Sequence, residues 1–143
     1  MVGKIQTILD TNIIYAGLYS ALGASFQVLQ AVTAGKIQPV LSVALLFEYE
    51  DVLKRNSRKL GLTHWDIDAF LDNMCSLSSF QKIFYLWRPF LTDPKDDHVL
   101  ELAVASQVKI ITTFNVKDFK NVAKFGVTIF SPKQLLEEIE WVH

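Results

Sequence analysis

The sequence predicts an α/β protein, a three-layer α/β/α sandwich with a central, mainly parallel β-sheet. Short apolar stretches rich in β-branched residues alternate with longer stretches in which apolar residues recur at helical spacing. Strands that alternate with helices favour a parallel sheet covered on both faces. The 143 residues, half of them hydrophobic, suffice for one folded domain, so we expect a single domain over residues 1–143.

Four strands are expected, at residues 5–9, 37–41, 108–112 and 127–130. Pro39 in the second of them indicates an edge strand or a strand start, because proline has no backbone N–H to donate. Residues 76–89 fit no element clearly, and residues 84–87 are compatible with either a strand or a buried helix.

Helices are expected at residues 24–34 and 93–106. Further helices are expected directly after the first strand and after each of three capping residues. The capping residues are Ser42, Thr63 with Asp66 three positions later, and Ser131 followed by proline and glutamine. The helix after Ser42 is expected to end at Gly61.

The overall composition argues against several classes of protein. Net charge is −1, with 14 basic and 15 acidic side chains, so nucleic-acid binding would need a local basic patch. Cys75 is the only cysteine, which excludes an intrachain disulfide and suits a reducing compartment. No apolar run approaches the length of a membrane span, and we expect a cytoplasmic protein. The three histidines lack metal-ligand spacing, and His98 is expected on a helix surface.

Several acidic residues fall where predicted elements meet. Asp10 follows the first strand at the sheet edge where ligands gather, although an aspartate there is also a good helix N-cap. Asp93 before proline is typical of an N-cap, and Asp96 of a capping-box partner. Asp97 shares a helix face with apolar residues, so it points inward and needs a cation, a hydrogen-bond network or a proton. Stabilisation by the helix dipole is a partial alternative.

Two further regions leave alternatives open. By periodicity, Glu48 and Glu50 are equally able to approach the sheet from opposite edges of one apolar stripe. After the strand at 108–112, a loop carries Thr113, Asn115 and Asp118, which also suits ordinary turn chemistry.

Taken in order, these short motifs resemble those of PIN-domain nucleases, and most closely the VapC-like toxins of prokaryotic toxin–antitoxin systems. The resemblance covers nearly the whole chain and implies a PIN-like fold with metal-dependent cleavage of RNA. It selects Glu48 over Glu50 and implies that one acidic quartet is both catalytic and metal-binding: Asp10, Glu48, Asp97 and Asp118.

The resemblance also implies partners and supporting residues. Such carboxylates suit one or two Mg²⁺ or Mn²⁺ ions. Asn115 stands where relatives often have aspartate, which keeps open a PIN-like RNA-binding or scaffold protein without turnover. A protein antitoxin and a homodimer are further expectations. The supporting residues would be Asn12, Thr113, Asn115, Asp93 and Asp96.

RNA could be held by a local basic cluster at the end of the helix that carries Glu48. The alternative is a solvated helix end, whose dipole favours cations. The candidate RNA contacts in this cluster are Lys54, Arg55, Arg58 and Lys59, and Lys117, which follows the Thr113 loop, is a further candidate.

Overall fold

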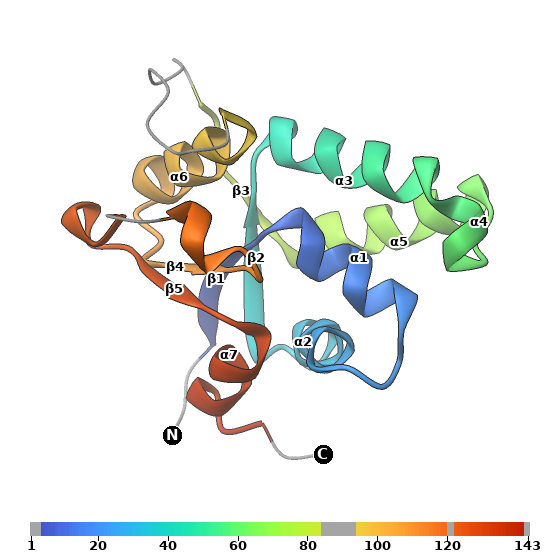
Figure 1. Ribbon diagram of the computed structural model, residues 1–143, viewed down its shortest axis with the longest axis horizontal. Helices are drawn as coiled ribbons and strands as arrows, with labels where there is room; N and C mark the ends of the chain where they lie inside the picture. The colour runs from blue at the N-terminus through green and yellow to red at the C-terminus, as the bar shows by residue number, and fades with distance from the viewer. Residues whose placement is uncertain (1–3, 84–93, 120–121, 142–143) are drawn as a thin grey trace.

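The computed structural model describes residues 4–83, 94–119 and 122–141, apart from the side chains of residues 94–97, 118 and 124. Within these ranges five strands form one sheet in the order β3-β2-β1-β4-β5, and every neighbouring pair is parallel (Figure 1). The predicted parallel sheet is therefore confirmed. The strands are β1 (Ile5–Leu9), β2 (Ile37–Leu41), β3 (Ser79–Phe80), β4 (Ile110–Thr112) and β5 (Thr128–Phe130).

Helices cover both faces of this sheet, as expected for parallel strands. Helix α6 packs against β1 and β4, and α1 and α2 lie on the opposite side (Figure 1). No helix in the described ranges is long and apolar enough to cross a membrane. The helices are α1 (Thr11–Tyr19), α2 (Ala24–Thr33), α3 (Val43–Arg55), α4 (Ser57–Leu60), α5 (His64–Leu77), α6 (Pro94–Ser106) and α7 (Pro132–Glu138), with 3-10 turns η1 (Val116–Phe119) and η2 (Val122–Phe125).

The predicted caps form as the sequence indicates. Ser42 accepts a hydrogen bond from the backbone of Leu45, and full capping boxes close at Thr63 and Ser131. The helix expected to run to Gly61 is instead broken: α3 ends at Arg55 and a single extra turn, α4, follows. Gly61 ends that turn with a left-handed backbone, φ 69°, which glycine adopts without steric cost.

The expectation that Pro39 marks an edge strand or a strand start is wrong. Pro39 is the third residue of β2, and β2 lies between β1 and β3. The proline is tolerated there because β3 is only two residues long and pairs with Val40 and Leu41, beyond the proline. Two other predicted strands are shorter than expected: β4 starts at Ile110 and β5 at Thr128. Residues 84–87 lie outside the described ranges.

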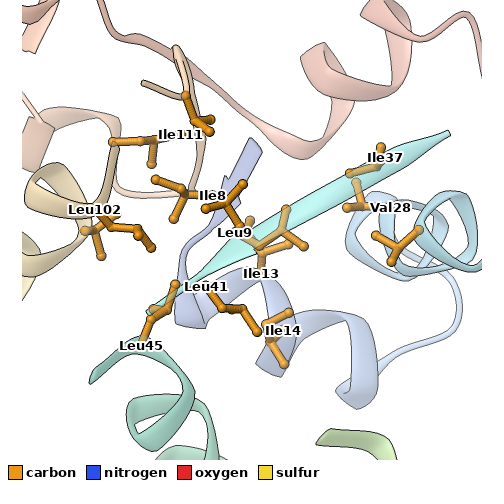
Figure 2. Packing of buried hydrophobic residues seen from close by; sticks show 14 of the residues in the cluster. Ile8, Leu9, Ile13, Ile14, Val28, Ile37, Leu41, Leu45, Leu102 and Ile111 are labelled. Atoms are coloured by element: carbon orange, nitrogen blue, oxygen red, sulfur yellow. The ribbon is translucent and has the colours of Figure 1, made fainter. Parts of the chain in front are cut away.

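The hydrophobic core holds the carboxyl end of β1 in place. Ile8 and Leu9 are fully buried, and Figure 2 shows them between Leu102 and Ile111 on one side and Ile13 on the other. Complete burial of an aliphatic side chain of this size contributes about 1.5–3 kcal/mol. Asp10, the residue after Leu9, therefore follows a tightly packed strand end.

Candidate active site

Asp10 is both a helix cap and the centre of a polar cluster. It follows β1, accepts a backbone bond from Thr11 at 2.9 Å as the N-cap of α1, and is 4% exposed. Its other carboxylate oxygen accepts the Thr113 hydroxyl at 2.7 Å and the Asn12 amide at 3.4 Å. The two interpretations of Asp10 are therefore compatible, because one oxygen caps the helix while the other faces Thr113, which follows β4, and Asn12 of α1.

Burial dominates the electrostatics of Asp10. Loss of hydration raises the pKa of its carboxyl group, and the negative charge of Glu48 raises the pKa further. The hydrogen bonds from Thr113 and Thr11 lower the pKa without cancelling the effect of burial. A carboxylate in this position is stabilised by any cation that enters the site.

Glu48 reaches the same site from α3 and is held at both oxygens. The Thr11 hydroxyl donates to Oε2, and His98 Nε2 lies 3.2 Å from Oε1. A carboxylate can only accept, so the His98 ring donates this bond. Glu50 instead faces Lys54, with which it forms an ion pair at 3.1 Å.

The expectation that His98 is a helix-surface residue is wrong. Its side chain is 21% exposed, and its Nδ1 atom is buried without a hydrogen-bond partner among the described residues. Spacing relative to other histidines could not identify it, because its partner is a glutamate on another helix. The adjacent Asp97 was the only local signal.

Tyr49 couples the two carboxylate-bearing segments. It follows Glu48 directly, is completely buried, and its hydroxyl donates to the backbone carbonyl of Leu9, the residue before Asp10. Burial, followed by the negative charges of Asp10 and Glu48, raises the pKa of Tyr49 well above its usual range, so the hydroxyl remains a donor. The start of α3 is thereby bonded to the end of β1.

A second group of hydroxyl and amide side chains orders the loop after β4. The Thr113 hydroxyl accepts the backbone N–H of Asn115 at 2.9 Å while donating to Asp10. Asn12 accepts the backbone N–H of Phe114 at 3.4 Å and donates toward Asp10. Three of the predicted supporting residues, Asn12, Thr113 and Asn115, are thus brought together around one carboxylate.

These residues border an open cleft of about 800 Å³. Its floor is acidic, and Phe47, 62% exposed, stands on its α3 side. Arg55 places one cation at the cleft border. The cleft is lined by Asp10, Asn12, Tyr15, Glu48, His98 and Asn115, among others.

A family model described as "PIN domain" matches residues 6–117 of the chain, well over half of its length. The chain belongs to the PIN-domain family. The predicted family is therefore confirmed, and with it the PIN-like α/β fold. PIN domains are nucleases, so this is a chain of a nuclease family.

A comparison of structures confirms the VapC-like resemblance at the level of the fold. The PIN domain is similar to a chain in the crystal structure of VapBC2 from Rickettsia felis bound to a DNA fragment from its promoter. The TM-score is 0.60 at 14% sequence identity, covering 89% of this chain and 98% of the other. No curated protein matches the sequence.

The remaining predicted acidic residues of this PIN domain are only partly described. Asp93 lies outside the described ranges, and Asp96 and Asp97 lie in α6 without described side chains. Asp97 directly precedes His98, which touches Glu48, so this end of α6 adjoins the cleft. The side chain of Asp118, in η1, is likewise not described.

The predicted basic cluster forms at the end of α3, but ion pairs occupy half of it. Lys54 contacts both Glu50 and Asp68, the latter at 2.8 Å, and these contacts raise the pKa of Lys54. Arg55 pairs with Asp51 at 3.0 Å. The other predicted RNA contacts, Arg58 and Lys59 of α4 and Lys117 of η1, are exposed and have no ion pair among the described residues.

The residues present fit a divalent metal ion of the hard type. Asp10 and Glu48 offer carboxylate oxygens at one cleft, and burial, with a smaller contribution from the negative charge of Glu48, raises the pKa of Asp10. Among the described residues no three His, Cys, Asp or Glu side chains form a metal-binding group. Further ligands would have to come from solvent or from side chains outside the described set.

Proposed function

We propose that this PIN domain is a metal-dependent endoribonuclease that hydrolyses RNA phosphodiester bonds. The observation that carries the proposal is the pairing of Asp10 and Glu48 across one open cleft, each held by a separate set of hydrogen bonds. Membership of a nuclease family supports the reaction type. The proposed catalytic quartet is Asp10, Glu48, Asp97 and Asp118.

Asp10 and Glu48 would hold one or two Mg²⁺ or Mn²⁺ ions, which supply an activated water and stabilise charge on the phosphate. The protein's own residues keep the acidic groups ready for this task. Thr113 and Asn12 orient Asp10, while Thr11 and His98 orient Glu48. Hydrogen-bond donors fix the orientation of a metal-coordinating carboxylate. These partners therefore reduce the movement that the two side chains need when an ion binds.

The test is cleavage of a panel of RNAs by the purified protein. We expect cleavage in Mg²⁺ or Mn²⁺, its loss in EDTA, and its return when metal is added in excess. Asp10→Asn should remove the cleavage, because the amide lacks the negative charge while keeping a similar shape and capping ability.

Full activity in chelator would refute the mechanism. RNA binding without cleavage in any metal would favour the alternative, a PIN-like RNA-binding or scaffold protein. Asn115 is the observation behind that alternative, since an amide at the cleft is a weaker metal ligand than a carboxylate.

We further propose that the protein acts in the cytoplasm as the toxin of a toxin–antitoxin pair and forms a homodimer. The structural similarity to a chain of the VapBC2 complex supports the antitoxin partner. Co-expression with a small neighbouring reading frame should relieve growth inhibition and yield a co-purifying complex. Unrelieved inhibition with every neighbouring frame would contradict the pairing, and a monomer in solution would contradict the dimer.

A further inference from the structure

We infer that a second pocket beside the cleft binds an unpaired nucleobase of the same RNA strand. This aromatic pocket, about 450 Å³, lies between α1, the loop after β4 and the start of α7. It is lined by Tyr15, Tyr19, Phe114, Ser131, Pro132 and Lys133, among others. The inference rests on the proposed function, which identifies RNA as the ligand.

The aromatic pocket is continuous with the acidic cleft. Tyr15 lines both. Phe114 lines the pocket, and the next residue, Asn115, lines the cleft. The backbone N–H of Phe114 also donates to Asn12 beside Asp10 at 3.4 Å. A strand with one phosphate at Asp10 can therefore place a neighbouring nucleotide in the pocket.

The pocket walls suit a flat aromatic ligand. Tyr15 and Tyr19 are four residues apart on one face of α1, and their rings stack with centroids 5.8 Å apart at an interplanar angle of 15°. Tyr19 is 61% exposed and Phe114 is 52% exposed, although large aromatic side chains are usually well buried. Unpaired bases are commonly bound by stacking on such rings.

Polar groups at the pocket suit the rest of a nucleotide. Lys133 is an exposed cation at the rim, positioned to attract a phosphate of the same strand. Ser25 also lines the pocket, and its hydroxyl has no hydrogen-bond partner among the described residues. A base edge could supply that partner. A paired base would have to leave its helix to enter, which selects against duplex RNA.

The experiment measures binding separately from cleavage. Fluorescence anisotropy in EDTA would report the Kd of a single-stranded RNA of about 12 nucleotides. We expect Tyr19→Ala and Phe114→Ala each to raise the Kd about 5- to 20-fold, and Tyr19→Phe to retain wild-type affinity because it keeps the ring. Trp65→Ala is the control, since Trp65 is 84% exposed and lines neither cavity.

Abasic oligonucleotides identify the interaction that is lost. Removing the base at one position should weaken wild-type binding by the same factor, and Tyr19→Ala should then have no further effect. Tyr19→Ala also removes the stacking on Tyr15, so a thermal melt checks that each variant is folded. An equal loss on the abasic strand would show that Tyr19 acts on something other than a base, which overturns the inference.

The outcomes also separate this inference from the proposed function. Wild-type cleavage with unchanged Kd in both variants overturns the pocket alone. No RNA binding or cleavage by wild type overturns both. Unchanged RNA binding with an altered oligomeric state in size-exclusion chromatography would assign the pocket to a protein contact and likewise overturn the inference.

Discussion

The acidic edge of the sheet and the basic end of α3 are both charged, but they are organised by different forces. At the acidic edge Asp10 is 4% exposed, and its oxygens meet donors from two elements of the fold. At the basic end, Arg55 and Asp51 pair while 64% and 63% exposed. A buried polar group must find fixed partners, whereas an exposed charge can exchange a neighbour for water at little cost.

This difference in burial determines which region can hold reacting groups in a fixed geometry. Tyr49, Thr113 and His98 each bind a group at the acidic edge from another part of the chain, so the core sets its geometry. At the basic end, Arg55 and Asp51 are four residues apart on one helix, and salt screens this exposed pair. Lys54 is less exposed and joins Glu50 of the same helix to Asp68 of α5. The first region is suited to positioning reacting groups, and the second to adjustable contact with a partner.

The largest expected effect is the difference in activity between two neutralised carboxylates on α3. Glu48→Gln should reduce metal-dependent RNA cleavage by about 100-fold or more, because a held charge at the cleft is lost. Glu50→Gln is the matched control, on the same helix but paired with Lys54 away from the acidic site. Initial cleavage rates in saturating Mg²⁺ compare them.

Equal losses in the two variants would break the distinction between the acidic edge and the exposed face of α3. Both proteins should keep nearly the same melting temperature. A large drop for either would make its lost activity a folding effect, and the comparison would then have to be repeated below that temperature.

The second-largest effect should come from removing the hydrogen bond between the Tyr49 hydroxyl and the Leu9 carbonyl, which joins α3 to the end of β1. Tyr49→Phe keeps the buried ring but leaves the Leu9 carbonyl without its hydroxyl donor. We expect a loss of about 1–2 kcal/mol in the free energy of unfolding, measured in urea. The affinity for Mg²⁺ should fall as well, since α3 is no longer bonded to the end of β1. Unchanged Mg²⁺ affinity would show that packing alone sets the spacing.

Most of the fold could be predicted from local patterns. Apolar periodicity identified the parallel sheet, and the side chains of Ser42, Thr63 and Ser131 carry their own capping signal within four residues. Asp10 was predictable because strand end and helix start are adjacent in the sequence. Such features depend on neighbours along the chain.

What could not be predicted depends on contacts between distant segments. Periodicity left Glu48 and Glu50 equivalent, because it does not say which edge of α3 meets the residue after β1. His98 and Tyr49 acquire their roles from partners 50 and 40 residues away. Pro39 was misplaced for the same reason: the short length of β3, not the proline itself, decides what β2 can tolerate.

A smaller effect tests the cost of burying charge at the acidic edge. Without metal, Asp10→Asn should raise the melting temperature by a few degrees at neutral pH, because burial disfavours the charged form. The Thr113 hydroxyl can rotate to accept from the new amide. In saturating Mg²⁺ the gain should shrink or reverse, since bound metal stabilises the wild type.

The pH dependence of that gain has a defined sign. The folded pKa of Asp10 is raised, so its protonated form stabilises the fold at acid pH and this stability is lost as pH rises through the folded value. The difference between Asp10→Asn and wild type should therefore be larger at about pH 7 than at about pH 4. A variant that melts below wild type in EDTA would show that the cap and the Thr113 bond outweigh the cost of burial.

The smallest expected effect separates the cations within the basic cluster. Lys54 is held by Glu50 and Asp68, whereas Arg58 is exposed and has no ion pair among the described residues. A cation that already has carboxylate partners gives up those contacts to reach a phosphate, so only the unpaired one should add to the salt dependence of RNA binding. We expect Arg58→Gln to lower the slope of log Kd against log salt by about 0.7, and Lys54→Gln to leave it unchanged. Equal slopes for both variants and wild type would mean that this end of α3 is a solvated surface and that RNA reaches the cleft by another route.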